Sequence, residues 1–318
     1  MENATGRQWQ RFWIASILLL IITATTYAQE STITLEIHSV KELNALFKRY
    51  HYTPDDWRAG IREVPRIYLA EVPGSWRKKT SKQISVIEKK RLFFRLLAPI
   101  VLYINERILA VRSKVESLAL QYDQGKTITE SNIAWLRDLG NEYSVPASAQ
   151  PVLEREFFTE LLRRIDIIPP SLALAQGAIE SGWGTSRFAD EGNSLFGQWS
   201  WSGGMVPAEQ RGAEHGDHRI AAFESTGLSV WSYTKNLNTH RAYDQFRRKR
   251  EELRRQGAVI RGKNLVQTMT AYSERGQAYV EELKTIMRQN KLDPADDAYL
   301  AKMEIIRIVP QTIDVNTQ

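Results

Sequence analysis

Hydrophobic residues recur at helical spacing over most of the chain. Between residues 81 and 122 they fall at steps of three and four, which predicts one long helix or two in succession, bent at Pro99. Similar spacing predicts further helices over residues 129–140, 151–167, 171–180, 226–250, 265–271 and 277–290. The chain is therefore expected to be mainly helical.

Strand patterns are short. Residues 218–223, which include RIAAF, are expected to pair with LFGQW at 195–199 as a hairpin. Residues 31–40 alternate weakly, and residues 40–50 fit a short helix. Pro54, Pro65 and Pro73 follow, so extended segments and turns are expected up to residue 80.

The N-terminal residues 1–28 have the pattern of an export signal. Arg7 and Arg11 precede an apolar run at 12–22, and Thr26-Tyr27-Ala28 offers a cleavage site before Gln29. The run is shorter than the roughly 20 residues that span a bilayer. We expect cleavage and export to the periplasm or another compartment outside the cytoplasm. If the segment stays uncleaved, it would anchor the chain to the membrane. The chain has no cysteine, which excludes lipid attachment after the apolar run.

The remaining patterns define provisional segments. Residues 29–80 form a poorly defined N-terminal extension, 81–149 a helical region, 150–292 the main domain and 293–318 a peripheral C-terminal tail. The connector NEYSVPASAQP at 141–151 fits a domain boundary or a loop within one domain.

The overall charge favours an anionic partner. The formal net charge is +6 and the sequence pI is about 9.4. Nine Trp and twelve Tyr suit carbohydrate, nucleic acid or protein surfaces, and export removes nucleic acid as the usual partner. The basic run RRKREELRR at 247–255 is expected to be a solvated helix face.

The sequence lacks nucleotide and metal signatures. GxGxxG, the phosphate-binding loop, HExxH and Cys/His clusters are absent. His215 and His218 lack a third ligand nearby, and Ser181 lies in ESG rather than in a nucleophile elbow. We therefore expect no metal, no cofactor and chemistry based on carboxylates.

Glu180 is the best-placed carboxylate. It follows the apolar segment SLALAQGAI at 171–179 and precedes Gly182 and Trp183. Burial there would raise its pKa, as a general acid in glycoside hydrolysis requires. A solvated glutamate at a helix end is the alternative, and the local sequence leaves both open.

The motifs around Glu180 resemble a known family. AQGAIESGWGTSRFADEGNSLFG at 175–197 is similar to the signature of bacterial glucosaminidases of glycoside hydrolase family 73, which includes autolysins and FlgJ-type peptidoglycan hydrolases. Together with SYTKNLNTHRAYDQFRRKR at 232–250, it resembles the Bax-like members. The resemblance covers about residues 150–290 strongly and is only suggestive from about residue 85.

This resemblance implies an α+β, lysozyme-like fold with a helical body and a small β-hairpin lobe. It implies cleavage of the N-acetylglucosaminyl-β-1,4-N-acetylmuramyl bond in peptidoglycan. Glu180 matches the catalytic acid of the family, and Tyr272 matches a tyrosine that lines the cleft. Trp183, Asn193 and Phe196 match positions that shape the substrate cleft, although core packing suits Trp183 and Phe196 equally well.

A second carboxylate is expected on the hairpin lobe. Glu209, Glu214 and Asp217 precede RIAAF, and the spacing to Phe223 favours Glu214, with Glu209 next. If none serves, the acetamido group of the substrate would act instead.

Two other functions fit the same residues. A lytic transglycosylase also uses one acid but would leave a 1,6-anhydro end, and no Gly-Leu-Met-Gln motif is present. A non-catalytic wall-binding protein is the other alternative. The sequence does not indicate an oligomeric state.

Overall fold

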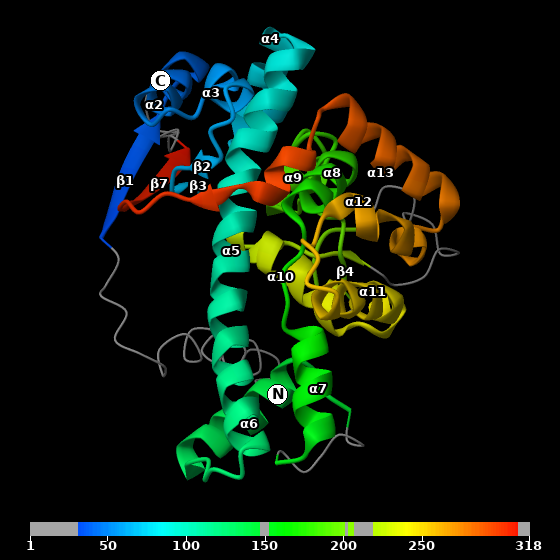
Figure 1. The fold of residues 1–318 in the computed structure, drawn as a ribbon. Helices are drawn as coiled ribbons and strands as arrows, with labels where there is room; N and C mark the ends of the chain where they lie inside the picture. The colour runs from blue at the N-terminus through cyan, green and yellow to red at the C-terminus, as the bar shows by residue number, and fades with distance from the viewer. Residues whose placement is uncertain (1–30, 147–152, 201–202, 207–218, 311–318) are drawn as a thin grey trace, which may run out of the picture. The chain divides into compact units, whose positions relative to one another are not determined.

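The long helix α5 (Val86–Asp123) packs against elements from both the N-terminal and the C-terminal parts of the chain (Figure 1). This computed structural model describes residues 31–146, 153–200, 203–206 and 219–310. The described residues from Ile33 onward form one compact unit. The hydrophobic spacing left one helix or two open, and α5 is one helix that contains Pro99. Its buried residues include Leu92, Leu97, Ile104 and Ile108, which recur at helical intervals.

The helices that follow α5 in the chain pack on it or on one another. They are α6 (Glu130–Glu142), α7 (Arg155–Arg164), α8 (Pro170–Glu180), α9 (Arg187–Gly192), α10 (Thr226–Thr239), η4 (Arg241–Tyr243), α11 (Asp244–Arg255), α12 (Gly262–Leu265), η5 (Val266–Ala271), α13 (Gln277–Gln289) and η6 (Asp293–Asp297). Of these, α7, α8 and α10 contact α5, and α13 contacts α8. The expected helix over 226–250 is divided at His240, whose backbone is extended.

The hairpin beside α8 forms as predicted. Strand β4 (Trp199–Ser200) pairs antiparallel with β5 (Arg219–Ile220), with Trp199 opposite Ile220. The residue after β5 is bonded to the residue before β4, because the Ala221 amide donates to the Gln198 carbonyl at 2.8 Å. The predicted fold, mainly helical with a small hairpin lobe, is confirmed.

The N-terminal and C-terminal segments build a second, smaller core against α5. The elements are β1 (Thr32–Ile37), α2 (Val40–Arg49), α3 (Pro54–Arg58), β2 (Glu63–Val64), β3 (Ile67–Leu69), the π-helix η1 (Trp76–Thr80), α4 (Ser81–Gln83), β6 (Tyr299–Leu300) and β7 (Ile305–Pro310). Strand β7 lies between β1 and β3, and Ile306 pairs with Ile67 in parallel register. Phe47, Leu92 and Ile306 share this core.

Two expectations differ from the structure. The described part of the tail, residues 293–310, is not peripheral, because β7 is the middle strand of its sheet and Ala295 is buried. The basic run 247–255 is not a uniformly solvated face, because Arg247 and Arg250 are 1% and 0% exposed. Both differences arise from contacts between distant segments, which local spacing does not encode.

None of the helices in the described ranges is long and apolar enough to cross a membrane.

Candidate active site

Helix α8 carries Glu180 out of the core. Its residues from Pro170 to Ala178 are all buried, so the helix lies inside the fold. Pro170 occupies the first turn, where its missing N–H costs little. The Asp296 carboxylate accepts from the Ser171 amide at 2.8 Å and caps this end. Glu180 is the last helical residue and is half-buried.

The turn after Glu180 explains the ESGWG sequence. Gly182, Trp183 and Gly184 all have positive φ values, of 55°, 63° and 75°. Glycine adopts this backbone readily, but tryptophan does so at a cost. The buried Ser181 hydroxyl accepts from the Gly184 amide at 2.8 Å and donates to the Gly177 carbonyl at 2.5 Å. These bonds hold a tight turn directly beside Glu180.

The surroundings of Glu180 favour its protonated form. Burial raises the pKa of the carboxyl above its usual value, and the charge of Glu282 raises it further. A hydrogen bond from Tyr279 and the charge of Arg275 act in the opposite direction without cancelling the effect. Arg275 and Glu282 form an ion pair at 2.7 Å. A carboxyl with a raised pKa can hold a proton for donation, which is what a general acid must do.

A chain of polar groups leads from the core to this carboxyl. The Tyr233 hydroxyl donates to the Gln176 side-chain oxygen at 2.7 Å, and the Gln176 nitrogen donates to the Tyr279 hydroxyl at 3.3 Å. The Tyr279 side chain in turn donates a hydrogen bond to the Glu180 carboxyl. Gln176 and Tyr233 are completely buried. The tyrosine that bonds Glu180 is therefore fixed in place by buried partners.

Tyr272 and Phe196 lie in the same aromatic cluster. Tyr272 stacks on Tyr279 with ring centroids 5.6 Å apart, and Phe196 stacks on Tyr233 at 3.9 Å. The Tyr272 hydroxyl donates to the Phe196 carbonyl at 2.9 Å. This bond holds the backbone that leads into Gly197, which borders the carboxyl. A Cβ added at Gly197 would lie 3.1 Å from the Glu180 Oε2 atom.

Trp183 and Asn193 make contacts that brace the fold. The Trp183 ring packs against Phe93 and Phe94 of α5, with centroids 5.9 and 5.2 Å away. The Asn193 oxygen accepts from the Val72 amide at 2.8 Å, and its nitrogen donates to the Phe223 carbonyl at 3.0 Å. The structure thus places Tyr272 and Phe196 near Glu180. Trp183 and Asn193 instead contact other parts of the fold.

The candidates for a second carboxylate, Glu209, Glu214 and Asp217, lie outside the described residues. The same holds for His215 and His218. Among the residues that the structure describes, no group of three metal-ligating side chains occurs.

Sequence reasoning missed Tyr279, Gln176, Arg275 and Glu282. Tyr279 and Glu282 lie on one face of α13, since they are separated by three positions, and Gln176 precedes Glu180 by one helical turn. This spacing is a usable signal within each helix. The two spacings point to one shared site only because α13 packs on α8.

Comparisons with known proteins identify the family of the chain. Residues 155–292 match the family model Glucosaminidase, described as mannosyl-glycoprotein endo-beta-N-acetylglucosaminidase. A curated relative, Protein bax of Escherichia coli strain K12, is 32% identical over 205 residues, which is 64% of this chain and 70% of that protein. The chain belongs to the Bax-like glucosaminidase family. The matched segment contains α8, the hairpin and α13, and it marks a glycosidase domain of the glucosaminidase class. No solved structure matches the chain.

Proposed function

We propose that this protein is an exported peptidoglycan hydrolase, an endo-β-N-acetylglucosaminidase with Glu180 as its general acid. The observation that carries the proposal is the half-buried Glu180 at the end of α8, with a raised pKa and a hydrogen bond from Tyr279. The family supports the glycosidase class. The resemblance of the ESGWG and NSLFG motifs supports peptidoglycan as substrate.

The bond proposed to break is the β-1,4 bond from N-acetylglucosamine to N-acetylmuramic acid. Glu180 would donate its proton to the leaving oxygen as the glycosidic bond breaks. The positive charge that develops on the sugar needs a second group. Glu214 is the first candidate, Glu209 the second, and the substrate acetamido group the third.

The aromatic cluster would shape the site around the acid. Tyr279 orients the carboxyl, and Tyr272 holds the backbone of Phe196. Export fits the signal pattern of residues 1–28 and the net charge of +6, since stem peptides carry free carboxylates.

Product analysis of digested sacculi tests this function. The proposal predicts fragments with N-acetylglucosamine at the reducing end, which borohydride converts to N-acetylglucosaminitol before mass spectrometry. Fragments that end in 1,6-anhydro-muramic acid would assign a lytic transglycosylase instead. Sacculi that bind the protein and release no fragments would assign a wall-binding role. Export is checked separately by sequencing the N-terminus of the secreted protein, which should begin at Gln29.

A further inference from the structure

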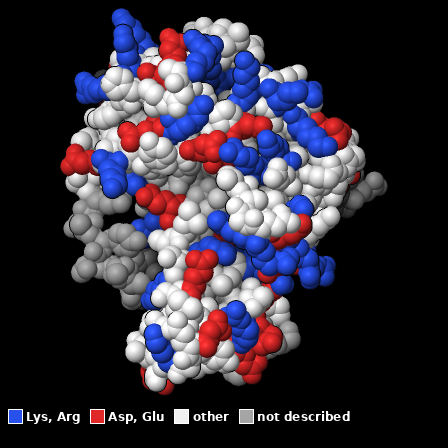
Figure 2. Space-filling view, viewed as in Figure 1, with Lys and Arg blue, Asp and Glu red and all other residues white. Residues whose placement is uncertain are grey.

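A group of basic side chains lies where η1, α4 and the start of α5 follow one another. Between residues 76 and 91 the sequence has one acidic residue, Glu88, whose carboxylate accepts from Asn44 at 2.8 Å. The basic residues in this stretch, named here the basic tip, are Arg77, Lys78, Lys79, Lys82, Lys89, Lys90 and Arg91. Figure 2 shows Lys and Arg side chains gathered around the top of the view, where α4 lies in Figure 1.

Most cations of the basic tip are available to an external anion. Arg77 lies 3.5 Å from Asp190, and Lys90 lies 4.7 Å from the centre of the Trp183 ring. No ion pair joins the other members to a residue in the described ranges. Lys78, Lys79 and Lys82 are exposed. Such a group attracts an anionic surface and is not needed to hold the fold.

Two apolar side chains project from the middle of the basic tip. Val86 and Ile87, at the start of α5, are each 62% exposed, more than any other large hydrophobic residue that the structure describes. Cations around exposed aliphatic side chains are the pattern of a segment that lies on a membrane surface. The aliphatic groups then enter the boundary between headgroups and acyl chains.

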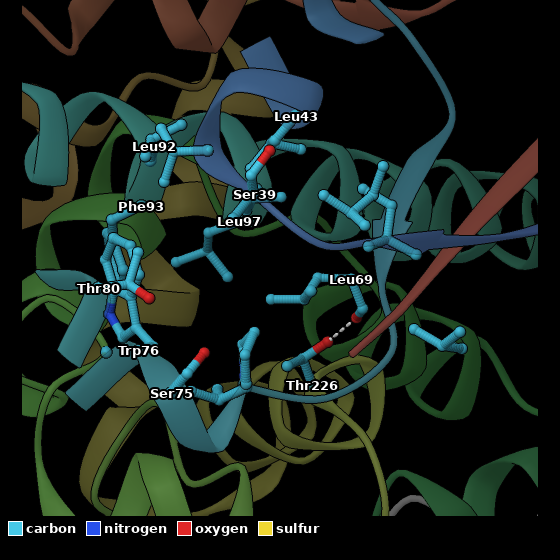
Figure 3. A pocket seen from close by; sticks show the side chains of 18 of the residues that line it. Ser39, Leu43, Leu69, Ser75, Trp76, Thr80, Leu92, Phe93, Leu97 and Thr226 are labelled. Carbon is cyan, nitrogen blue, oxygen red and sulfur yellow. Dashed lines mark hydrogen bonds between the residues drawn. The ribbon is translucent and has the colours of Figure 1, made fainter. Parts of the chain in front are cut away.

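An apolar pocket lies next to the basic tip, walled by η1 and α5 together with α2 and the strands β1, β3 and β7 (Figure 3). Trp76 and Thr80 come from η1, next to Arg77 and Lys79, and Leu92 follows Arg91 in α5. The pocket volume is about 140 Å³. An apolar cavity of roughly 150 Å³ is large enough to bind benzene, so this pocket can hold a short stretch of hydrocarbon chain.

The chemistry of the lining argues against a sugar. Among the described residues that line the pocket there is no carboxylate, Lys or Arg, and the few polar ones are His38, Ser39, Ser75, Thr80 and Thr226. The Thr226 hydroxyl is already bonded to the Leu69 carbonyl, as the dashed line in Figure 3 shows. The remaining wall is aliphatic or aromatic apart from Gly184, as a hydrocarbon ligand requires.

We propose that the basic tip and the adjoining pocket bind an anionic phospholipid at a membrane surface. The headgroup phosphate lies against lysines of the tip, Val86 and Ile87 enter the lipid layer, and part of one acyl chain occupies the pocket. An acidic wall polymer would use the cations but not the exposed aliphatic pair or the apolar pocket. Glu180 is not among the described residues that line the pocket, although Gly184 of the turn beside it is.

Vesicle flotation tests the basic tip. The full chain should bind vesicles of phosphatidylcholine and phosphatidylglycerol more tightly than vesicles of phosphatidylcholine alone. Replacing Lys78, Lys79, Lys82 and Lys89 by Glu should weaken binding to the anionic vesicles at least about tenfold. The matched control makes the same charge change at exposed residues elsewhere: Arg255, Lys263, Arg288 and Lys291. Both variants keep residues 12–22, so a difference between them reports on the tip.

Equal binding by the two variants would overturn the proposal. So would binding of the tip to purified sacculi, lost in the tip variant, without any preference for anionic vesicles. That result would assign the tip to the wall polymer.

Fluorescence quenching tests the pocket. Phosphatidylglycerol with brominated acyl chains should quench Trp76, which lines the pocket, and the Trp76→Phe variant should lose that part of the quenching. Thermal unfolding of the variant checks that it is folded, because the Trp76 indole donates to the Trp183 carbonyl at 3.1 Å. Unchanged quenching in folded Trp76→Phe would show that no acyl chain enters the pocket.

Discussion

At the scale of single residues, the protonation of Glu180 is set by a few neighbours. Burial raises the pKa of the carboxyl, Glu282 adds to the rise, and Tyr279 and Arg275 oppose it. In the proposed mechanism the acid form of Glu180 is the active one, so activity should be present at low pH and lost as pH rises through the pKa of Glu180. The same shift makes the ionised residue a cost to stability. The contribution of Glu180 to folding stability is fully present below the pKa that Glu180 has in the unfolded chain. It is lost as pH rises through the higher pKa that Glu180 has in the folded protein.

Replacing Tyr279 by Phe tests how this pKa is tuned. The Tyr279 hydroxyl stabilises the carboxylate, so its removal should raise the pKa of Glu180 and move the alkaline limb of the kcat/KM profile to higher pH. The Tyr272→Phe variant is the comparison, since that hydroxyl donates to Phe196. Its alkaline limb should stay in place even if kcat falls. Equal shifts of the alkaline limb in the Tyr279→Phe and Tyr272→Phe variants would contradict the assignment of Tyr279.

Gly197 should tolerate no side chain. An alanine there would take a φ of 60° and place its Cβ 3.1 Å from the Glu180 Oε2 atom. We expect a loss of about 1–2 kcal/mol from backbone strain, together with a reduced kcat.

Gly125→Ala is the matched control for Gly197→Ala. Gly125 has a similar φ of 65°, and nothing lies within 4 Å of an added Cβ. Both variants should lose comparable stability in thermal unfolding, and only Gly197→Ala should lose turnover. A reduced kcat in both would mean that strain alone explains the effect.

At the scale of the elements, arginines join α11 to the segment that follows α7. Asp166 follows α7 and is 2% exposed, and Arg254 of α11 binds it through two hydrogen bonds of 2.7 and 3.0 Å. Arg250 is fully buried and donates to the Asp166 carbonyl at 3.2 Å. Burial alone would raise the pKa of Asp166, but Arg250, Arg254 and Arg112 together hold it below its usual value.

The Asp166→Asn variant should unfold more easily, because Arg250 would remain buried without its counter-charge. We expect a loss of about 3–5 kcal/mol in denaturant unfolding near neutral pH. The stabilising contribution of Asp166 is present above the pKa of the unfolded chain and is lost as pH falls through the lower folded pKa. The difference in unfolding free energy between the Asp166→Asn variant and the wild type should therefore become smaller at acidic pH.

Asp138→Asn, an exposed acid on α6, is the control for Asp166→Asn and should change little. A neutral effect of Asp166→Asn would show that Arg250 finds sufficient carbonyl partners without the carboxylate.

The sequence predicted elements whose pattern is local. The apolar run before Glu180 indicated α8, and the spacing over 81–122 indicated α5. Arg247 and Arg250 were missed because a basic run is normally solvated, and their burial depends on backbone carbonyls such as those of Leu237 and Ile167. A local sequence pattern does not predict hydrogen-bond acceptors that distant segments of the chain supply.

At the scale of the whole molecule, the two ends of the described chain meet in one sheet. Strand β7 lies between β1 and β3, and Ile306 pairs with Ile67. Strand β7 has only a short and weak strand pattern in the sequence. Its parallel pairing with the distant strand β3 cannot be predicted from the local sequence. The same limit applied to Tyr279, which reaches Glu180 only because α13 packs on α8.

Ile306→Ala tests whether the C-terminal strand stabilises the fold. Ile306 is 2% exposed in the smaller core, so its truncation should cost about 2–5 kcal/mol. The adjacent Arg307 points to the exposed face of the same strand, and Arg307→Ala should have little effect. Both are measured by thermal unfolding. A loss in Ile306→Ala no larger than that in Arg307→Ala would mean that packing of the Ile306 side chain adds little to stability.

The central claim, that Glu180 is the general acid, is tested most directly by the Glu180→Gln variant. Release of soluble fragments from sacculi should fall at least about 100-fold, the typical contribution of a positioned acid. Thermal stability at neutral pH should be equal or higher, because the amide cannot ionise. Glu130→Gln, at an exposed position on α6, is the control and should match the wild type. Fragment release by a folded Glu180→Gln variant at the wild-type rate would contradict the account.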